Sequence, residues 1–115
     1  MTTLYGISNC DTVRKARKWL EARGVAFEFH DFRKQGLGAD KVAHWCDAVG
    51  LDKVLNKRGT TWRQLPDEVK ATTDEQALQA LMVEQPTLIK RPVLELDDGR
   101  VEVGFKDTDY AALFD

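Results

Sequence analysis

The stretch LYGISNCDTVRKARKWL, residues 4–20, places Cys10 between a short apolar segment and a basic, amphipathic one. Leu4, Tyr5 and Ile7 are typical of a short buried strand that a turn ends. From Asp11 or Thr12 to Arg23, apolar residues recur at helical spacing, and Gly24 follows as a stop signal. The stretch therefore predicts a strand, a tight turn that holds Cys10, and a helix.

The next segments extend this order. Residues 25–32 alternate in the manner of a strand, so strand, helix and strand predict a parallel pair with a right-handed crossover. Residues 34–38 predict a loop, and residues 39–49 predict a second helix that ends at Gly50.

The middle of the chain, residues 51–85, is polar and broken by Gly59, Pro66 and Pro86. It predicts two or three short helices, the clearest running from Thr73 or Asp74 to Glu84. An Asp-Gly turn at residues 97–100 then joins two alternating runs, 88–96 and 101–103, which is a hairpin signal.

The last segment, residues 107–114, predicts a short helix capped by Asp107 or Thr108. The whole order predicts an α/β fold, with a four-stranded mixed sheet flanked by helices. This is the thioredoxin-like arrangement, with a helical insertion at about residues 38–86. With 115 residues, we expect one domain over residues 1–115.

Composition narrows the classes of function. Lys and Arg number 17 against 19 for Asp and Glu, a net charge of −2, which argues against a nucleic-acid or membrane-surface partner recognised by bulk charge. No apolar run has the length of a membrane helix, and residues 1–5 lack the features of a signal peptide. We therefore expect a cytoplasmic protein whose thiols are kept reduced.

Cys10 is the candidate nucleophile. A cysteine at the first turn of a helix faces unpaired backbone N–H groups and the positive end of the helix dipole, and both favour the thiolate. Arg14 and Lys15 add positive potential, although solvent screens it. The alternative is a small buried residue beside a solvated basic face.

Cys10 has no neighbouring resolving thiol, because a Cys-x-x-Cys pair would need cysteine at position 13 or 7 and these are Val13 and Ile7. A disulfide on Cys10 must then be resolved by an external thiol or by the distant Cys46. Cys46 falls on the apolar stripe of its helix, so we interpret it as a core residue.

Five motifs give the chain a family resemblance. In order they are YGISNCDTVRKARKWLE, FHDFRKQGL, VLNKRGTTWRQL, LIKRPVLE and VGFKDTDY, and together they span residues 4–110. With these motifs the chain resembles the ArsC/Spx arsenate-reductase-like family, and most of all its YffB subgroup. The resemblance implies a thioredoxin-like domain with a helical insertion.

The resemblance also implies a site. The family's nucleophile corresponds to Cys10, its oxyanion-binding arginines to Arg58 and Arg91, and its cis proline to Pro92. A third arginine of arsenate reductases falls at Lys106, which keeps the charge but lacks the planar fork that grips an oxyanion. Asn9, Arg14 and Arg63 are further candidate helpers of this site, and the alternative for Arg63 is a surface residue.

The function so implied is a glutathione-dependent thiol reductase that uses Cys10. Glutathione would be the co-substrate, an oxidised thiol or an oxyanion the substrate, and glutaredoxin a further partner. Arsenate reduction is one alternative, although residues 8–13 depart from the loop of arsenate reductases. Another is a non-enzymatic regulator that binds RNA polymerase, as the Spx branch does.

A metal site is not expected. His30 lies within a predicted strand with no cysteine or histidine at ligand spacing, and His44 lies off the apolar stripe of its helix. With so few ligands, both histidines are more typical of structural or surface residues. No bound cofactor is predicted.

Overall fold

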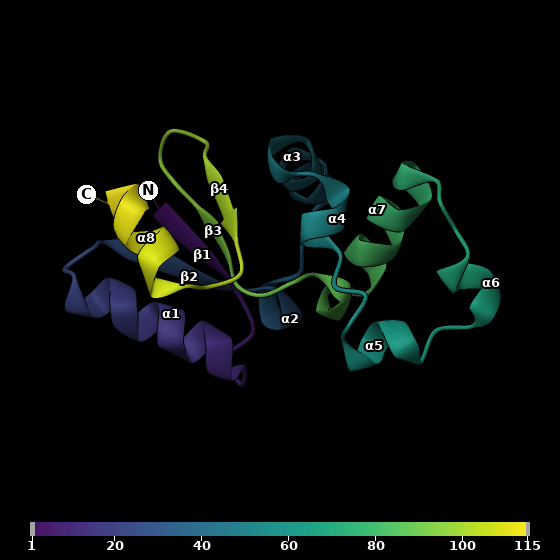
Figure 1. Cartoon of the computed structure of the whole chain (residues 1–115), viewed down its shortest axis with the longest axis horizontal. Helices are drawn as coiled ribbons and strands as arrows, with labels where there is room; N and C mark the ends of the chain where they lie inside the picture. The colour runs from purple at the N-terminus through teal and green to yellow at the C-terminus, as the bar shows by residue number, and fades with distance from the viewer. Residues whose placement is uncertain (1, 115) are drawn as a thin grey trace. The chain divides into compact units, whose positions relative to one another are not determined.

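A computed structural model describes residues 2–114 of the chain. The contacts divide it into two compact units (Figure 1). The first combines the residues up to Gln35 with those from Arg91 on, and the second is residues 36–90. Each unit is described by itself below.

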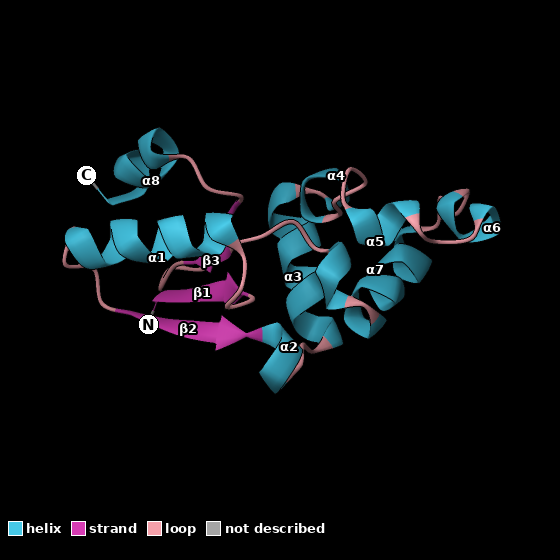
Figure 2. Cartoon of the chain, turned by 90° about the horizontal axis from the view of Figure 1, so that it is seen from below, coloured by secondary structure: helices cyan, strands magenta, loops and turns pink. Residues whose placement is uncertain are grey.

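The first unit contains a four-stranded mixed sheet. Its strands are β1 (Thr2–Gly6), β2 (Phe27–Asp31), β3 (Val93–Glu95) and β4 (Val101–Val103), in the order β2-β1-β3-β4. β1 and β2 are parallel and point the same way in Figure 2, whereas β3 is antiparallel to both of its neighbours. The predicted thioredoxin-like arrangement of strands is confirmed.

Two helices of this unit, α1 (Asp11–Ala22) and α8 (Asp107–Phe114), lie on the same side of the sheet (Figure 2). In register, Leu4 of β1 faces Phe29 of β2 and Leu94 of β3. Because alternate residues of a strand share a face, these side chains form one apolar surface. The core cluster under the two helices joins Leu4 and Leu94 to four of their residues: Val13, Ala16, Leu20 and Tyr110.

The predicted strand at residues 25–32 is shorter than expected. After β2, Phe32 begins a one-turn helix, α2 (Phe32–Gln35), in part of the segment predicted as a loop. Local hydrogen bonds explain the turn: Asp31 Oδ1 accepts from the Arg33 N–H at 3.0 Å, and Gln35 Oε1 accepts from the Asp31 N–H at 3.0 Å. Such side-chain bonds compete with a sheet ladder.

The second unit is helical, as expected, but has more short helices than the two or three predicted for residues 51–85. Its elements are α3 (Ala39–Val49), α4 (Leu51–Val54), α5 (Thr60–Arg63), α6 (Asp67–Lys70), α7 (Glu75–Glu84) and the 3₁₀ helix η1 (Pro86–Leu88). α3 has the predicted bounds, and Asp74 caps α7 by accepting from the Ala77 N–H at 3.2 Å. Helices of one turn carry too little periodicity to be counted from sequence.

The predicted strand at residues 88–96 is wrong in its first half. Leu88 ends η1, and Ile89 forms an isolated antiparallel bridge with Leu55 inside the second unit. Only Val93–Glu95 joins the sheet, directly after a cis peptide bond between Arg91 and Pro92. An alternating apolar run does not reveal that one of its residues, Ile89, pairs with a partner outside the sheet.

No helix within residues 2–114 is long and apolar enough to cross a membrane.

Candidate active site

Cys10 is the residue that caps the start of α1. Its backbone is extended, its carbonyl accepts the first helical hydrogen bond from the Arg14 N–H at 3.0 Å, and its side chain makes no capping bond. The side chain is partly buried and packs against the core cluster. The cysteine is therefore held by the strand-to-helix turn, as the sequence predicts, and its sulfur is not used up as a helix cap.

The nearest charges along α1 form a pair. Asp11 Oδ1 and Arg14 Nη2 are 2.6 Å apart, and both side chains are largely exposed. Asp11 therefore offsets the positive charge that Arg14 was predicted to bring to Cys10, and the role of Arg14 as a helper stays a prediction. Asn9 lies exposed in the turn before Cys10.

Three chain segments meet at the edge of the sheet from which the Cys10 turn leaves. β1 ends at Gly6, four residues before Cys10, and its Tyr5 lies opposite Val93, the first residue of β3. Val93 in turn lies opposite Val103, the last residue of β4. The carboxyl ends of β1 and β4 and the amino end of β3 therefore lie at one edge.

This topology brings predicted site residues from distant parts of the chain to the Cys10 end of the sheet. Arg91 and Pro92 directly precede β3, and Lys106 follows β4 by three residues. The Pro92 carbonyl accepts from the Gly104 N–H at 2.8 Å, and this hydrogen bond joins the segment before β3 to the segment after β4. Pro92 is buried, Arg91 is half-buried, and Lys106 is exposed just before α8.

Arg58 and Arg63 belong to the other compact unit. Arg58 lies exposed in the loop before α5, where the Asn56 side chain accepts from its N–H at 3.1 Å. Arg63 is an exposed residue of α5. The place of both arginines in the site with Cys10 stays a prediction.

Cys46 differs from Cys10 in its surroundings. It lies on α3 with 7% of its surface exposed, and both cysteines are free thiols. Burial raises the pKa of the Cys46 thiol to about 11, and the carboxylates of Glu75 and Asp47 add to the rise. Since a thiolate is the attacking species, Cys46 is poorly suited to act as a resolving thiol near neutral pH.

The two histidines lie on different elements, one against an aromatic ring and one at the surface. His30 lies on β2 with its ring 5.0 Å from the ring of Tyr5, and His44 is exposed on α3. Within residues 2–114, no group of three or more His, Cys, Asp or Glu side chains is arranged to hold a metal ion.

A cleft of about 740 Å³ adjoins the site in the first unit, and the sequence analysis did not identify it. Its lining comes from one face of α1 and from the segment that leads into α8: Thr12, Lys15, Lys18, Trp19, Phe105, Lys106, Asp107 and Thr108. A sequence signal exists, because Thr12, Lys15 and Trp19 recur at helical spacing. This spacing is difficult to recognise, because most of residues 14–18 are basic and not only the lysines on this face.

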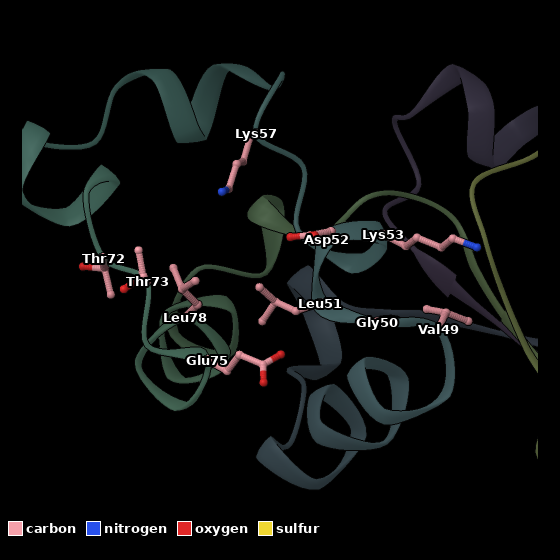
Figure 3. Close-up of a pocket in the computed structure, with 10 residues that line it drawn as sticks. All are labelled: Val49, Gly50, Leu51, Asp52, Lys53, Lys57, Thr72, Thr73, Glu75 and Leu78. Atoms are coloured by element: carbon pink, nitrogen blue, oxygen red, sulfur yellow. The ribbon is translucent and has the colours of Figure 1, made fainter.

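A second pocket, of about 610 Å³, lies within the other unit (Figure 3). Lys57 points into it, while Lys53 and Val49 point away from its other lining residues. No residue predicted for the active site lines it.

The chain belongs to the ArsC family, whose model matches residues 5–113. Among solved structures, it is similar to a YffB protein, with 48% identity, 97% of each chain covered and a TM-score of 0.93. It is also similar to an arsenate reductase (ArsC) related protein from Brucella melitensis, with 46% identity, 98% of this chain and 93% of that chain covered, and a TM-score of 0.77.

The curated proteins that are similar to this chain include an uncharacterized protein and a regulator. An uncharacterized protein of Haemophilus influenzae is 43% identical over 114 residues, which cover 99% of each chain. The global transcriptional regulator Spx of Streptococcus agalactiae is 29% identical, over 97% of this chain and 82% of that protein. The predicted family and fold are confirmed, and the similar proteins include one described as related to arsenate reductase and one described as a transcriptional regulator.

Proposed function

We propose that the protein is a thiol reductase of the cytoplasm that uses Cys10 as its nucleophile and glutathione as its co-substrate. The observation that carries the proposal is the meeting of Cys10, the Arg91–Pro92 segment and Lys106 at one edge of the sheet in a single compact unit. A nucleophile and two cationic groups at one edge suit an anionic or polarised sulfur or oxyanion substrate.

The chemistry follows thiol–disulfide exchange. The Cys10 sulfur attacks one sulfur of a substrate disulfide, forms a mixed disulfide, and releases the other sulfur as a thiolate. A glutathione thiolate then displaces the bound half and leaves glutathione on Cys10. A second glutathione, or a glutaredoxin, releases Cys10, so that two electrons pass from two thiols to the substrate disulfide.

The surroundings of the two cysteines support this assignment. Cys10 is partly exposed at a helix start, where no side-chain cap bond occupies its sulfur. Cys46 is buried with a pKa of about 11. An external thiol is therefore the better resolving group, which is the reason for giving glutathione that role.

Arg91 and Lys106 would hold the anionic groups of substrate and glutathione in this proposal, with Arg58 as a third cation. A lysine binds an anion as a point charge, whereas an arginine provides a bidentate fork. The lysine at position 106 therefore suits a disulfide substrate better than arsenate. The Brucella relative described as related to arsenate reductase keeps arsenate as a second candidate.

A regulatory function is the candidate from another class, and the Spx relatives favour it. In that case the protein would bind RNA polymerase and its action would not need the Cys10 sulfur. Pull-down of polymerase subunits by a Cys10→Ser variant, together with absent reductase activity in the wild type, would support it.

The first experiment is to incubate the reduced protein with oxidised glutathione near neutral pH and to locate the adduct by intact mass and peptide mapping. Cys10→Ser and Cys46→Ser are the paired controls. We expect rapid modification of Cys10 alone, no adduct in Cys10→Ser, and wild-type behaviour in Cys46→Ser. Turnover assays with disulfide and arsenate substrates then separate the two reductase candidates.

If oxidised glutathione leaves Cys10 unmodified, or modifies it no faster than Cys46, the glutathione mechanism is contradicted.

A further inference from the structure

The cleft between α1 and the start of α8 carries an inference beyond reductase chemistry. We propose that it is a docking groove for an acidic, extended segment of a protein substrate whose sulfur reacts with Cys10. The reaction of the segment with Cys10 rests on the proposed function, whereas the binding of the segment to the groove does not.

The charge of the groove is the first argument. Lys15, Lys18 and Lys106 line it, against the single carboxylate of Asp107. Within residues 2–114, no carboxylate forms an ion pair with any of the three lysines. The groove is therefore locally cationic on a chain whose net charge is −2, and it is complementary to an acidic partner.

Two of the residues that line the groove are aromatic, and both pack against a third aromatic ring. Trp19 and Phe105 line it, and each makes an edge-to-face contact with Tyr110, at centroid distances of 5.5 Å and 4.7 Å. Tyr110 itself is fully buried. Aromatic side chains of this kind provide apolar contact area at low cost in conformational entropy.

The dimensions favour a peptide segment. From Thr12 to Trp19 the helix rises by about 10 Å, which is the span of about three residues of extended chain. Lys15 and Lys18 are neighbours on the helix surface, about 5–6 Å apart at Cβ. Carboxylates on alternate residues of an extended segment are spaced by about 7 Å, so each of two acidic residues can face one lysine.

The position of the groove links it to the reaction. Thr12, at one end of the lining, is two residues after Cys10 on the same helix. A segment that lies along α1 therefore leads its own cysteine toward the nucleophile. The effective concentration of the substrate sulfur near Cys10 then rises without any new contact at the reacting sulfur.

The test measures the rate at which Cys10 forms a mixed disulfide with short peptides. Each peptide contains one cysteine activated as a mixed disulfide with 2-thiopyridine, which leaves with the electron pair of the broken S–S bond. One set has Asp-Ser-Asp next to the cysteine, on its amino or its carboxyl side, and the matched set has Asn-Ser-Asn. Bis(2-hydroxyethyl) disulfide is the small, uncharged comparison.

In the wild type at low salt we expect the better Asp peptide to react about tenfold faster than its Asn match, which corresponds to about 1.4 kcal/mol. Lys15→Gln/Lys18→Gln should lose most of this preference. Arg33→Gln/Lys34→Gln changes the net charge equally at two exposed residues of α2 outside the groove, and this variant should keep the preference for the Asp peptide. The rate of each variant with the uncharged disulfide serves as its reference, so that any effect of Lys15 on the Cys10 thiolate itself is divided out of the peptide rates.

Equal rates for Asp and Asn peptides in the wild type would overturn the proposal, as would an equal loss in the Arg33→Gln/Lys34→Gln control. So would preferential binding of glutathione or an oligonucleotide at these lysines without any preference among the peptides.

Binding is read separately with a cysteine-free Asp peptide, followed by the NMR shift of the Trp19 indole N–H. A shift of this signal in the wild type but not in Lys15→Gln/Lys18→Gln supports the docking groove. If Cys10 at the same time fails to react with the uncharged disulfide, the reductase proposal is contradicted and the docking proposal is not.

Discussion

Cys46 lies on α3 with its thiol removed from water, and this makes its protonation state part of the stability of the fold. Burial, followed by the charges of Glu75 and Asp47, raises the pKa of the Cys46 thiol from 9.0 to about 11. At pH 7 only about one Cys46 side chain in ten thousand is then a thiolate. The folded state therefore binds this proton more tightly than the unfolded state does.

The pH dependence has a definite sign. A folded-state pKa above the unfolded value gives a stabilisation that is complete below pH 9.0 and is lost as the pH rises toward about 11. We expect the free energy of unfolding of the wild type to fall more steeply over this range than that of Cys46→Ala. Urea unfolding of both proteins at several pH values measures the difference, and parallel curves would contradict it.

Tyr110 presents a second residue-level prediction. Its hydroxyl is buried without a hydrogen-bond partner among the described residues, and burial raises the pKa of its phenol, with Glu102 adding to the effect. A buried hydroxyl without a partner costs about 1–3 kcal/mol. We therefore expect Tyr110→Phe to unfold at higher urea concentration than the wild type, with a gain of about 1 kcal/mol.

A loss of stability in Tyr110→Phe would show that the hydroxyl has a partner in solution. Phe105→Leu serves as the control. It weakens the ring contact between Phe105 and Tyr110 without changing a polar group, so it should destabilise the protein.

At the scale of elements, the packing of α1 on β1 depends on the absence of a side chain at Gly6. A Cβ built on Gly6 would lie 2.7 Å from Cγ2 of Val13, a fully buried residue of α1. The strand and the helix that flank Cys10 therefore approach more closely at this point than any larger residue allows.

We expect Gly6→Ala to lower the free energy of unfolding by about 1–3 kcal/mol, because the added methyl overpacks this contact. Val13→Ala removes the atoms that the methyl would meet, so the double variant should lose less stability than the sum of the two single variants, by about 0.5 kcal/mol or more. Simple additivity in denaturant unfolding would show that the backbone moves to accept the methyl instead.

On the scale of the whole molecule, the chain forms two compact units that each bury their own apolar residues. Leu94 belongs to the core cluster of the first unit, and Met82 is fully buried on α7 of the second. Because buried contacts are dense within each unit, opening fluctuations should follow the same division.

Hydrogen exchange of the native protein tests this division. We expect Met82→Ala, which costs about 2–5 kcal/mol, to accelerate amide exchange mainly within residues 36–90. Leu94→Ala should accelerate exchange mainly in β1, β3 and α1. Equal acceleration of both units by both variants would mean that the chain opens as one cooperative body.

The sequence by itself determined the elements that are regular and amphipathic. Helical spacing located α1 and α3 to within a residue, the Asp-Gly turn located the hairpin of β3 and β4, and the strand-to-helix turn identified Cys10. These features are local, because a period of 2 or 3.6 and a turn residue are readable over a few positions. One-turn helices such as α2 and α6 left no such period.

Only the tertiary structure decided which distant residues meet. It divided residues 88–96 between a bridge to Leu55 and the sheet, brought the Arg91–Pro92 segment to the Cys10 edge through the pairing of β3 with β1, and formed the lysine-lined groove by placing the start of α8 beside α1. The physical reason is that strand partners and helix neighbours are selected by long-range packing. A single run of sequence specifies its own period and faces, but it does not specify the surface on which those faces pack.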